Sequence, residues 1–301
     1  MGDPKTALKI SLKIGARWRW LSVVFLGLLL ILPVPPILAN PDPLVIGVFP
    51  RRNAKMTFKM FTPLTKHLSE KLGRPVNLET TANFKDFWDG VSTLRYDLVH
   101  YNQYHYIRSH KKLGYDVILK NEELGKADIA GAIAVRIDSN IKTIEDLKGQ
   151  KIVFGGGPKA MMSYIIPTYL LRQAGLKVGD YQEDFAKSPP NAILSTYYKQ
   201  STAAGVGDIV LHLPSIKSKC NTSQLTHLAV SEPVAHLPWA VKADIPEKLK
   251  LEIQSILVQL NKTVAGKSVL EQAGLTGLVE AQDSDYNRHR EITFEVLGEQ
   301  Y

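Results

Sequence analysis

The segment from Phe154 to Ser163, FGGGPKAMMS, combines residue types that proteins use to hold an anion. Three glycines, a proline and a lysine follow the β-like run KIVF and precede the helix-like run YIIPTYLLRQAG. A strand, a glycine turn and a helix N-terminus can present free backbone N–H groups to a negative ligand. We expect either an anion cradle, with Lys159 and the N–H groups of residues 159–162 as donors, or a tight turn with a solvated lysine.

The spacing within this segment excludes two nucleotide-binding motifs. A Walker A loop would require Gly-Lys-Ser or Gly-Lys-Thr four residues after Gly157, where Met161 and Met162 stand instead. A dinucleotide-binding fingerprint would require glycine at Ala160. Any anion held here is therefore bound without either motif.

No other pattern predicts catalysis. The chain contains no G-x-S-x-G elbow and no H-E-x-x-H pair, and Ser163 and Ser195 lack nearby histidine and carboxylate partners in sequence. His100, His105 and His110 recur every five residues, a step that turns a helix by about 140°, so they do not share one face. We expect no enzyme activity, no cofactor and no metal ion.

Residues 1–39 have the pattern of an export signal. Five basic residues lead into the apolar run LSVVFLGLLLILPVP, and PPILAN offers a small-residue cleavage site after Ala39. The alternative is a retained membrane anchor, although the uncharged run from Trp20 to Pro33 is short for a span of about 20 residues. We expect a mature protein that begins near Asn40 and works in the periplasm.

Charge and cysteine content narrow the classes of partner. Residues 1–39 carry five Lys or Arg and one Asp, so their removal lowers the formal net charge from +8 to +4. No basic run remains that would predict a nucleic-acid surface. The only cysteine, Cys220, excludes an internal disulfide. We therefore expect a monomer stabilised by its own hydrophobic core.

Strand-like and helix-like segments alternate along the mature chain, which predicts α/β lobes with parallel strands. The predicted strands are residues 43–49, 76–81, 97–102, 115–121, 151–154 and 207–213. The first helix should end at Gly73 and the second should begin after the N-cap Asn83. Residues 40–134 and 233–301 form the predicted first lobe, and residues 135–232 form a second lobe inserted into it, with a cleft between them.

The order of these segments resembles a known family. PLVIGVFP, KLGRPV, DLVHYN, DLKGQKIVFGGGP, the helix with Pro167, GDIV and IPEKLKLEIQSILVQL follow one another as in the periplasmic solute-binding proteins of ABC importers. The chain is most similar to the phosphonate/phosphite/phosphate-binding branch, over residues 44–295. The resemblance implies two α/β lobes that close on a ligand around a hinge without catalysing a reaction.

Only part of that family's ligand site carries over. Tyr101 matches a strand-end tyrosine in a D-hydrophobic-x-x-Y pattern, and Asp208 matches a pocket aspartate. In the family a proline-rich link runs beside the cleft, which would place His236 and Trp239 near the hinge. The predicted ligand-binding residues are Tyr101, Asn102, Lys159, Ser163, Asp208 and His236.

Other positions depart from the family's pattern. Its Ser-Thr-Ser stretch falls on Ala160, Met161 and Met162, its pocket aromatic falls on Phe84, and its histidine–glutamate pair falls on Ser188 and Pro189. The methionines either stand at the cleft, where they would favour a larger or partly apolar ligand, or pack into the second lobe's core. These departures leave the identity of the ligand open.

Two functions follow from the resemblance. The first is capture of a small solute, a phosphonate or another anion, for an ABC permease in the inner membrane. The alternative is a ligand-sensing periplasmic protein that signals to a membrane kinase or cyclase.

Overall fold

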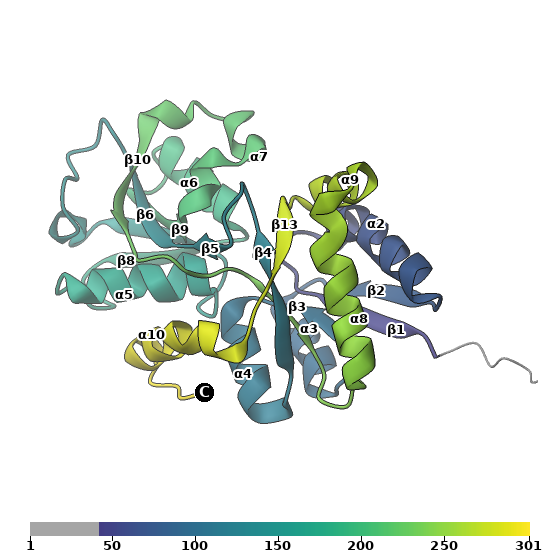
Figure 1. The fold of residues 1–301 in the computed structure, drawn as a ribbon. Coiled ribbons are helices and arrows are strands. Elements are labelled where there is room, and N and C mark those ends of the chain that lie inside the picture. Colours follow the sequence, from purple (N-terminus) through teal and green to yellow (C-terminus); the bar gives the residue numbers. More distant parts are fainter. Residues whose placement is uncertain (1–41) are drawn as a thin grey trace, which may run out of the picture. The chain divides into compact units, whose positions relative to one another are not determined.

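The computed structural model describes residues 42–301, in which helices and strands alternate as expected. The export signal predicted for residues 1–39 lies outside the described residues. Within residues 42–301, no helix is long and apolar enough to cross a membrane. Two mixed sheets, each with helices on both faces, make up this part of the chain (Figure 1).

The first sheet has six strands in the order β13-β4-β12-β3-β1-β2. They are β1 (Leu44–Val48), β2 (Val76–Thr80), β3 (Leu98–His100), β4 (Asp116–Glu122), β12 (Pro238–Val241) and β13 (Gly277–Glu280). β1, β2 and β3 are parallel, whereas β12 and β13 pair antiparallel with their neighbours. One face is covered by α2 (Ala54–Leu72), α8 (Glu247–Val258) and α9 (Val264–Ala273), and the other by α3 (Phe84–Ser92) and α4 (Gln103–Leu113).

The second sheet has five strands in the order β10-β6-β9-β7-β8. They are β6 (Gly131–Arg136), β7 (Lys151–Gly155), β8 (Gln182–Ala186), β9 (Ala203–Gly207) and β10 (Leu225–Val230). A π-helical turn (Met161–Ile165) leads into α5 (Ile166–Gln173) on one face, and α6 (Pro189–Tyr197) covers the other. The short helix α7 (Pro214–Lys217) and the 3-10 turns Glu145–Leu147, Asp208–His212, Thr222–Gln224, Gln259–Lys262 and Asp283–Tyr286 complete the elements.

A two-stranded antiparallel ribbon connects the two sheets. It pairs β5 (Asp128–Ile129) with β11 (Val234–Ala235), so the chain enters the second sheet through one strand and returns through the other. The expected two-lobed α/β fold, with the second lobe inserted in the first, is thereby confirmed. The boundary predicted between residues 134 and 135 comes too late, because it falls inside β6, which pairs only in the second sheet.

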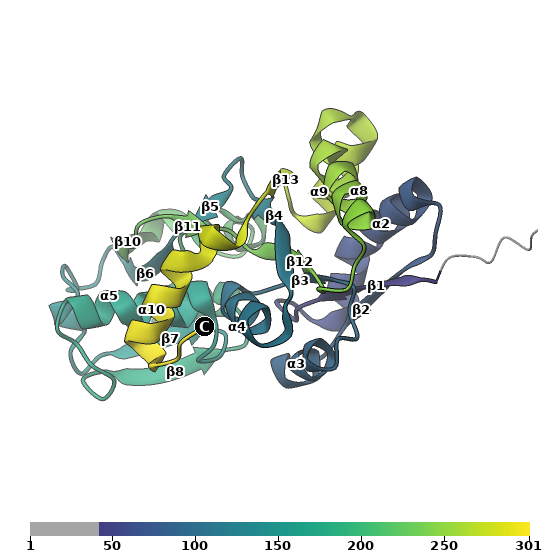
Figure 2. The ribbon, with the colours of Figure 1, turned by 60° about the horizontal axis from the view of Figure 1, so that its bottom comes forward.

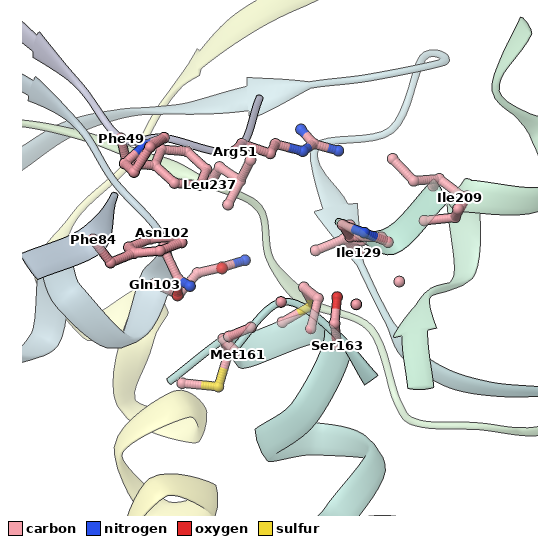
Figure 3. A pocket seen from close by; sticks show the side chains of 18 of the residues that line it. Phe49, Arg51, Phe84, Asn102, Gln103, Ile129, Met161, Ser163, Ile209 and Leu237 are labelled. Carbon is pink, nitrogen blue, oxygen red and sulfur yellow. The ribbon is translucent and has the colours of Figure 1, made fainter. Parts of the chain in front are cut away.

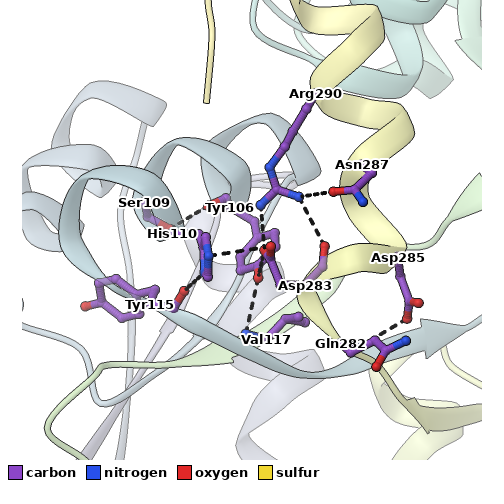
Figure 4. A network of polar contacts seen from close by, with 10 residues as sticks. All are labelled: Tyr106, Ser109, His110, Tyr115, Val117, Gln282, Asp283, Asp285, Asn287 and Arg290. Atoms are coloured by element: carbon purple, nitrogen blue, oxygen red, sulfur yellow. Dashed lines mark hydrogen bonds and ion pairs between the residues drawn. The ribbon is translucent and has the colours of Figure 1, made fainter.

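The C-terminal helix α10 (Asn287–Leu297) contacts both lobes, although its sequence position assigned it to the first. Figure 2 shows it lying across α4 and α5. At its start, Asp283 accepts a hydrogen bond from Tyr106 on α4 and pairs with Arg290 (Figure 4). At its end, Arg172 on α5 donates to the carbonyl oxygen of Glu295. The C-terminal segment therefore bridges the lobes.

Both predicted helix ends are confirmed. Gly73 terminates α2 in the left-handed conformation, with φ of 61°, where a Cβ would be strained. The Asn83 side chain caps α3 by accepting the N–H of Asp86 at 2.9 Å. These two ends are determined by local geometry, which is why the sequence alone predicts them.

The strand predicted at residues 207–213 is wrong. Residues 208–212 form a 3-10 turn, and the strand of this region is β9, one segment earlier. β9 reads Ala-Ala-Gly-Val-Gly, which has little intrinsic strand preference. It sits at the centre of the sheet because its small residues allow close packing: a Cβ on Gly205 would lie 2.4 Å from the Phe154 ring.

Gly155 provides a test of close packing at the end of β7. A Cβ at this position would lie 2.4 Å from the Cα of Pro189, a backbone atom at the start of α6 that cannot move independently. We expect Gly155→Ala to lower the free energy of unfolding by about 1–3 kcal/mol, measured by urea denaturation. Gly157→Ala is the matched control, because nothing lies within 4 Å of its added Cβ. Equal stabilities for the two variants would contradict this packing.

Candidate ligand-binding cavity

A cavity of about 80 Å³ lies between the two lobes (Figure 3). Its walls come from the segments that follow β1 and β3 in the first lobe and β7 and β9 in the second, together with the ribbon residue Ile129. This is the crevice at the carboxyl ends of the strands, where open α/β sheets bind their ligands. Its side chains include Phe49, Arg51, Phe84, Asn102, Gln103, Met161, Met162, Ser163, Lys187, Ile209, Val210 and Leu237.

Three neutral polar side chains face this cavity. Asn102 is already engaged, since its Oδ1 caps α4 by accepting the Tyr104 N–H and its Nδ2 donates to the Lys159 carbonyl at 3.1 Å. Gln103 and Ser163 point into the open space from opposite lobes (Figure 3). Asn102 and Ser163 thus line the cavity from the positions that the sequence predicted, and their contact with a ligand stays a prediction.

Tyr101 does not line the cavity, which contradicts its predicted position. Its side chain is completely buried in the core of the first lobe, with its ring against those of Phe87, Tyr106 and Tyr115. The backbone explains this placement. Tyr101 directly follows β3 and its side chain packs on the face covered by α3 and α4, while the next two residues line the cleft.

Lys159 also points away from the cavity. Its ammonium pairs with Glu299 in the C-terminal segment and lies 4.9 Å from the centre of the Tyr104 ring. The glycine turn is used internally as well, because the Gly156 N–H donates to Ala186 at 2.9 Å and the Ala160 N–H donates to Gly157. The Lys159 ammonium is therefore engaged outside the cavity. The N–H groups of Met161, Met162 and Ser163, at the start of the π-helical turn that lines the cavity, have no hydrogen-bond partner within residues 42–301, and their contact with an anion stays a prediction.

Asp208 has a structural position at the lobe connection. Its Oδ1 accepts the Ala130 N–H at 3.1 Å, and its own N–H donates to the Ala130 carbonyl at 2.9 Å. The carboxylate thus binds the backbone where β5 leads into β6, and its neighbours Gly207 and Ile209 line the cavity instead. The prediction that the Asp208 side chain projects into the cleft is wrong.

His236 lies at the ribbon between the lobes, buried to 1% exposure and outside the cavity wall. Its Nδ1 accepts the N–H of Leu237 at 2.7 Å. Burial lowers the pKa of this imidazole to about 4, so it is neutral at pH 7. His236 thus stands next to the ribbon that joins the lobes but does not line the cavity as predicted, and Trp239 lies in the core of the first sheet, stacked on His100.

Arg51 is one of the cavity residues that the sequence analysis missed, together with Gln103 and Lys187. It follows β1 and donates from Nη1 to Oε1 of Glu123 at 2.8 Å. Burial alone would raise the pKa of Glu123, but Arg51 beside it lowers that pKa to about 2. The pair is therefore ionised, and much of the charge of Arg51 is neutralised within the protein. The run Phe49-Pro50-Arg51 directly after the first strand was the available signal.

A larger outer pocket opens from the cavity. It shares Arg51, Phe84, Lys187 and Pro189 with the inner cavity, and adds Arg52, Ser188 and Lys219 among its lining side chains. Its lining contains no aspartate or glutamate. The outer pocket therefore includes three positions at which this chain departs from the family's pattern, namely Phe84, Ser188 and Pro189. The outer pocket forms the mouth of the site, and its lining is electropositive. The lining of the inner cavity holds no histidine, cysteine or carboxylate that could act as an acid or base.

Comparison with known families identifies this arrangement. Residues 46–286 match the model of the phosphonate-binding family, the periplasmic substrate-binding proteins of ABC phosphonate transporters. The chain belongs to this family. It is a family of transporter substrate-binding proteins rather than of enzymes, and its periplasmic setting agrees with the expected location.

Solved structures of low sequence identity share the fold. PhnD1 from Prochlorococcus marinus, in complex with methylphosphonate, has a TM-score of 0.74 and 20% identity over 85% of this chain and 98% of its own. A binding protein component of an ABC phosphonate transporter from Pseudomonas aeruginosa has a TM-score of 0.73 and 14% identity over 84% and 86% of the two chains. A Xanthomonas citri protein bound to ATP has a TM-score of 0.68 and 15% identity over 84% of this chain and 96% of its own, and a structure of it bound to chloride has a TM-score of 0.70.

The Lys159–Glu299 pair predicts a measurable coupling. Glu299 Oε2 also accepts the Tyr104 hydroxyl at 2.6 Å, so the carboxylate joins the glycine turn to α4. We expect Lys159→Met and Glu299→Gln each to lower the free energy of unfolding by up to about 1 kcal/mol, with a coupling of about 0.5–1 kcal/mol in the double variant. Urea denaturation of the four proteins measures this coupling, and strictly additive effects would show that the pair is not formed.

Burial of neutral His236 predicts a pH dependence of stability. The unfolded imidazole has a pKa near 6.5, and the folded one about 4. Between these values the unfolded chain binds a proton that the folded protein does not, so stability falls as pH falls through this window, by up to about 1.4 kcal/mol per pH unit. The charged groups that act on the ring are Glu123, Arg51, Asp208 and Asp128.

The variant His236→Asn isolates this contribution, because its amide oxygen can replace Nδ1 as the acceptor for Leu237. We expect a shallower fall in the free energy of unfolding between pH 6.5 and 4.5 than in the wild type, measured by chemical denaturation at several pH values. His212→Asn, at an exposed position, is the control and should leave the slope unchanged. A His236→Asn profile parallel to the wild-type profile would contradict the burial argument.

Proposed function

We propose that this protein captures a small anionic solute of the phosphonate type outside the cytoplasm and delivers it to an ABC permease in the inner membrane. The proposal rests on the cavity at the strand ends between the lobes. Its charged lining residues are Arg51 and Lys187, with no carboxylate among the rest. A buried anion requires such donors, because desolvating a charge without a partner is costly.

The family and its fold support the same function. Family members are periplasmic phosphonate-binding components of ABC transporters. Structures that share the fold contain anions of different size, namely methylphosphonate and ATP. A cleft between two lobes joined by a narrow ribbon suits a carrier, since closure holds the solute and opening releases it. The same closure could signal to a membrane kinase or cyclase, but no particular contact in residues 42–301 favours that alternative.

Ligand titration of the mature protein tests the proposal. We expect thermal and chemical stabilisation by one or more of the anions methylphosphonate, phosphite and phosphate, but not by polyamines. A ligand at 100 times its dissociation constant should stabilise the folded state by about 2.7 kcal/mol. Selective stabilisation by polyamines, or by neutral solutes alone, would contradict an anion carrier.

The Ser163 hydroxyl supplies a variant for the same assay. Ser163→Ala should weaken binding of the anion found in the screen by about 1–3 kcal/mol, if the hydroxyl donates to a charged oxygen. Ser195→Ala, on α6 and outside the cavity lining, is the control and should bind as the wild type does. Isothermal titration calorimetry measures both, and equal affinities would remove Ser163 from the site.

A further inference from the structure

A single carboxylate near the C-terminus contacts both lobes. α10 ends at Gly298, whose left-handed conformation, with φ of 68°, turns the chain back toward α4 (Figure 2). The Glu299 carboxylate accepts a hydrogen bond from the Tyr104 hydroxyl on α4 at 2.6 Å and pairs with the Lys159 ammonium in the second lobe. The Tyr301 hydroxyl donates to the same carboxylate at 2.7 Å, and its ring packs edge-on against that of Tyr104.

Residues 299–301, the C-terminal clasp, lie where the two lobes also touch directly. Asn102 Nδ2 in the first lobe donates to the Lys159 carbonyl oxygen in the second at 3.1 Å. Lys159 is therefore held to the first lobe twice, by Asn102 through its carbonyl and by the clasp through its ammonium. Two residues further on, the chain enters the turn of residues 161–163, whose N–H groups have no partner within residues 42–301 and line the cavity. The contacts of Lys159 thus hold this part of the cavity wall against the first lobe.

The carboxylate of the clasp is ionised at neutral pH. Partial burial acts to raise the pKa of Glu299, but hydrogen bonds from Lys159, Tyr104 and Tyr301 outweigh it and lower that pKa to about 2. The side chains of Lys159 and Glu299 are 40% and 30% exposed. Ion pairs of such exposure are weak, and losing one changes an equilibrium by about two- to fivefold. That effect is large enough to alter how often two lobes part, although it is too small to hold a lobe folded.

The body of α10 keeps the clasp in place. Before the helix begins, Asp283 accepts a hydrogen bond from Tyr106 in the first lobe at 2.7 Å. Toward the end of the helix, Arg172 on α5 of the second lobe donates to the Glu295 carbonyl oxygen. The segment is thus tied to both lobes before the chain reaches Glu299, so the clasp is not free to follow one lobe alone.

Opening of the lobes around the ribbon of β5 and β11 would move Tyr104 away from Lys159, and Glu299 cannot follow both. We propose that the C-terminal clasp is a latch for lobe closure, in which Glu299 is a positioning residue that favours the closed cleft and slows the escape of a bound solute. The part that concerns the solute rests on the proposed function, whereas the bias toward closure does not.

Pulsed electron paramagnetic resonance of the ligand-free mature protein tests the latch. Spin labels on Lys59→Cys in α2 and Lys217→Cys in α7 report the separation of the lobes, because residues of these two helices line one pocket from different lobes. Both positions are exposed, and the buried native cysteine is replaced by Cys220→Ser. We expect Glu299→Gln to raise the ratio of the long-distance to the short-distance population about two- to fivefold. An unchanged distribution in a folded Glu299→Gln protein would overturn the latch.

Glu79→Gln is the matched control. Glu79 pairs with Arg95, and its side chain is also 30% exposed, but both partners belong to the first lobe. This variant should therefore leave the label distances unchanged. Exchange of the two charges, in the double variant Lys159→Glu and Glu299→Lys, should restore the wild-type ratio that Glu299→Lys alone loses. If the exchange restores nothing, the charge pair across the lobes is not what favours closure.

Stopped-flow tryptophan fluorescence with methylphosphonate as the probe tests the effect on a bound solute. We expect Glu299→Gln to release methylphosphonate about two- to fivefold faster than the wild type, with the association rate within about twofold. An unchanged release rate in a variant whose ligand-free form does open would overturn the role of the clasp in retention. Absence of methylphosphonate binding to the wild type would count against the proposed phosphonate-type solute, whereas the label distances would still decide the latch.

Discussion

The two hydrogen bonds between Asp208 and Ala130 hold the end of β9 against the point where the chain enters the second lobe. The cavity depends on this connection, because Gly207 and Ile209 on one side and Ile129 on the other form part of its wall. A carboxylate that accepts a backbone N–H satisfies a group that the sheet leaves unpaired at its edge. The shape of the cleft therefore depends on hydrogen bonds to the Ala130 backbone, not on a side chain that binds the ligand.

The distribution of paired and unpaired charges then gives the cleft its polarity. Arg51 lines the cavity and Lys159 stands at the glycine turn, and each is matched by a carboxylate, Glu123 and Glu299 respectively. These two ion pairs hold segments of the chain together. Removing one partner of such a pair would leave the other charge uncompensated and destabilise the fold. Arg52, Lys187 and Lys219 line the outer pocket and form no ion pair within residues 42–301, so they add positive charge at the mouth of the cleft.

Membership of the phosphonate-binding family explains the fold, whereas the side chains of the cavity determine which ligand fits. The family accounts for the two lobes, the ribbon between them and the cleft at the strand ends, all of which require only backbone pairing and buried apolar faces. The side chains that border the cleft decide which solute fits. In this chain the turn before α5 presents Met161 and Met162 to the cavity, whose lining is mainly apolar.

The sequence by itself determined the features that depend on local pattern. The alternation of elements, the glycine end of α2, the asparagine cap of α3 and the two-lobed fold follow from periodicity, backbone preference and motif order. It also placed Asn102 and Ser163 at the cleft, because both stand directly at the start of a helix that follows a strand.

The directions and partners of side chains were decided only by the tertiary structure. Tyr101 and Asn102 are neighbours in sequence, yet one fills the core and the other faces the cleft, since successive residues at a strand end point to opposite sides. Lys159 meets Glu299, 140 residues away, and this pairing removes it from any anion site. No local pattern encodes a partner so distant in sequence, because only packing of the C-terminal segment across both lobes brings the two charges together.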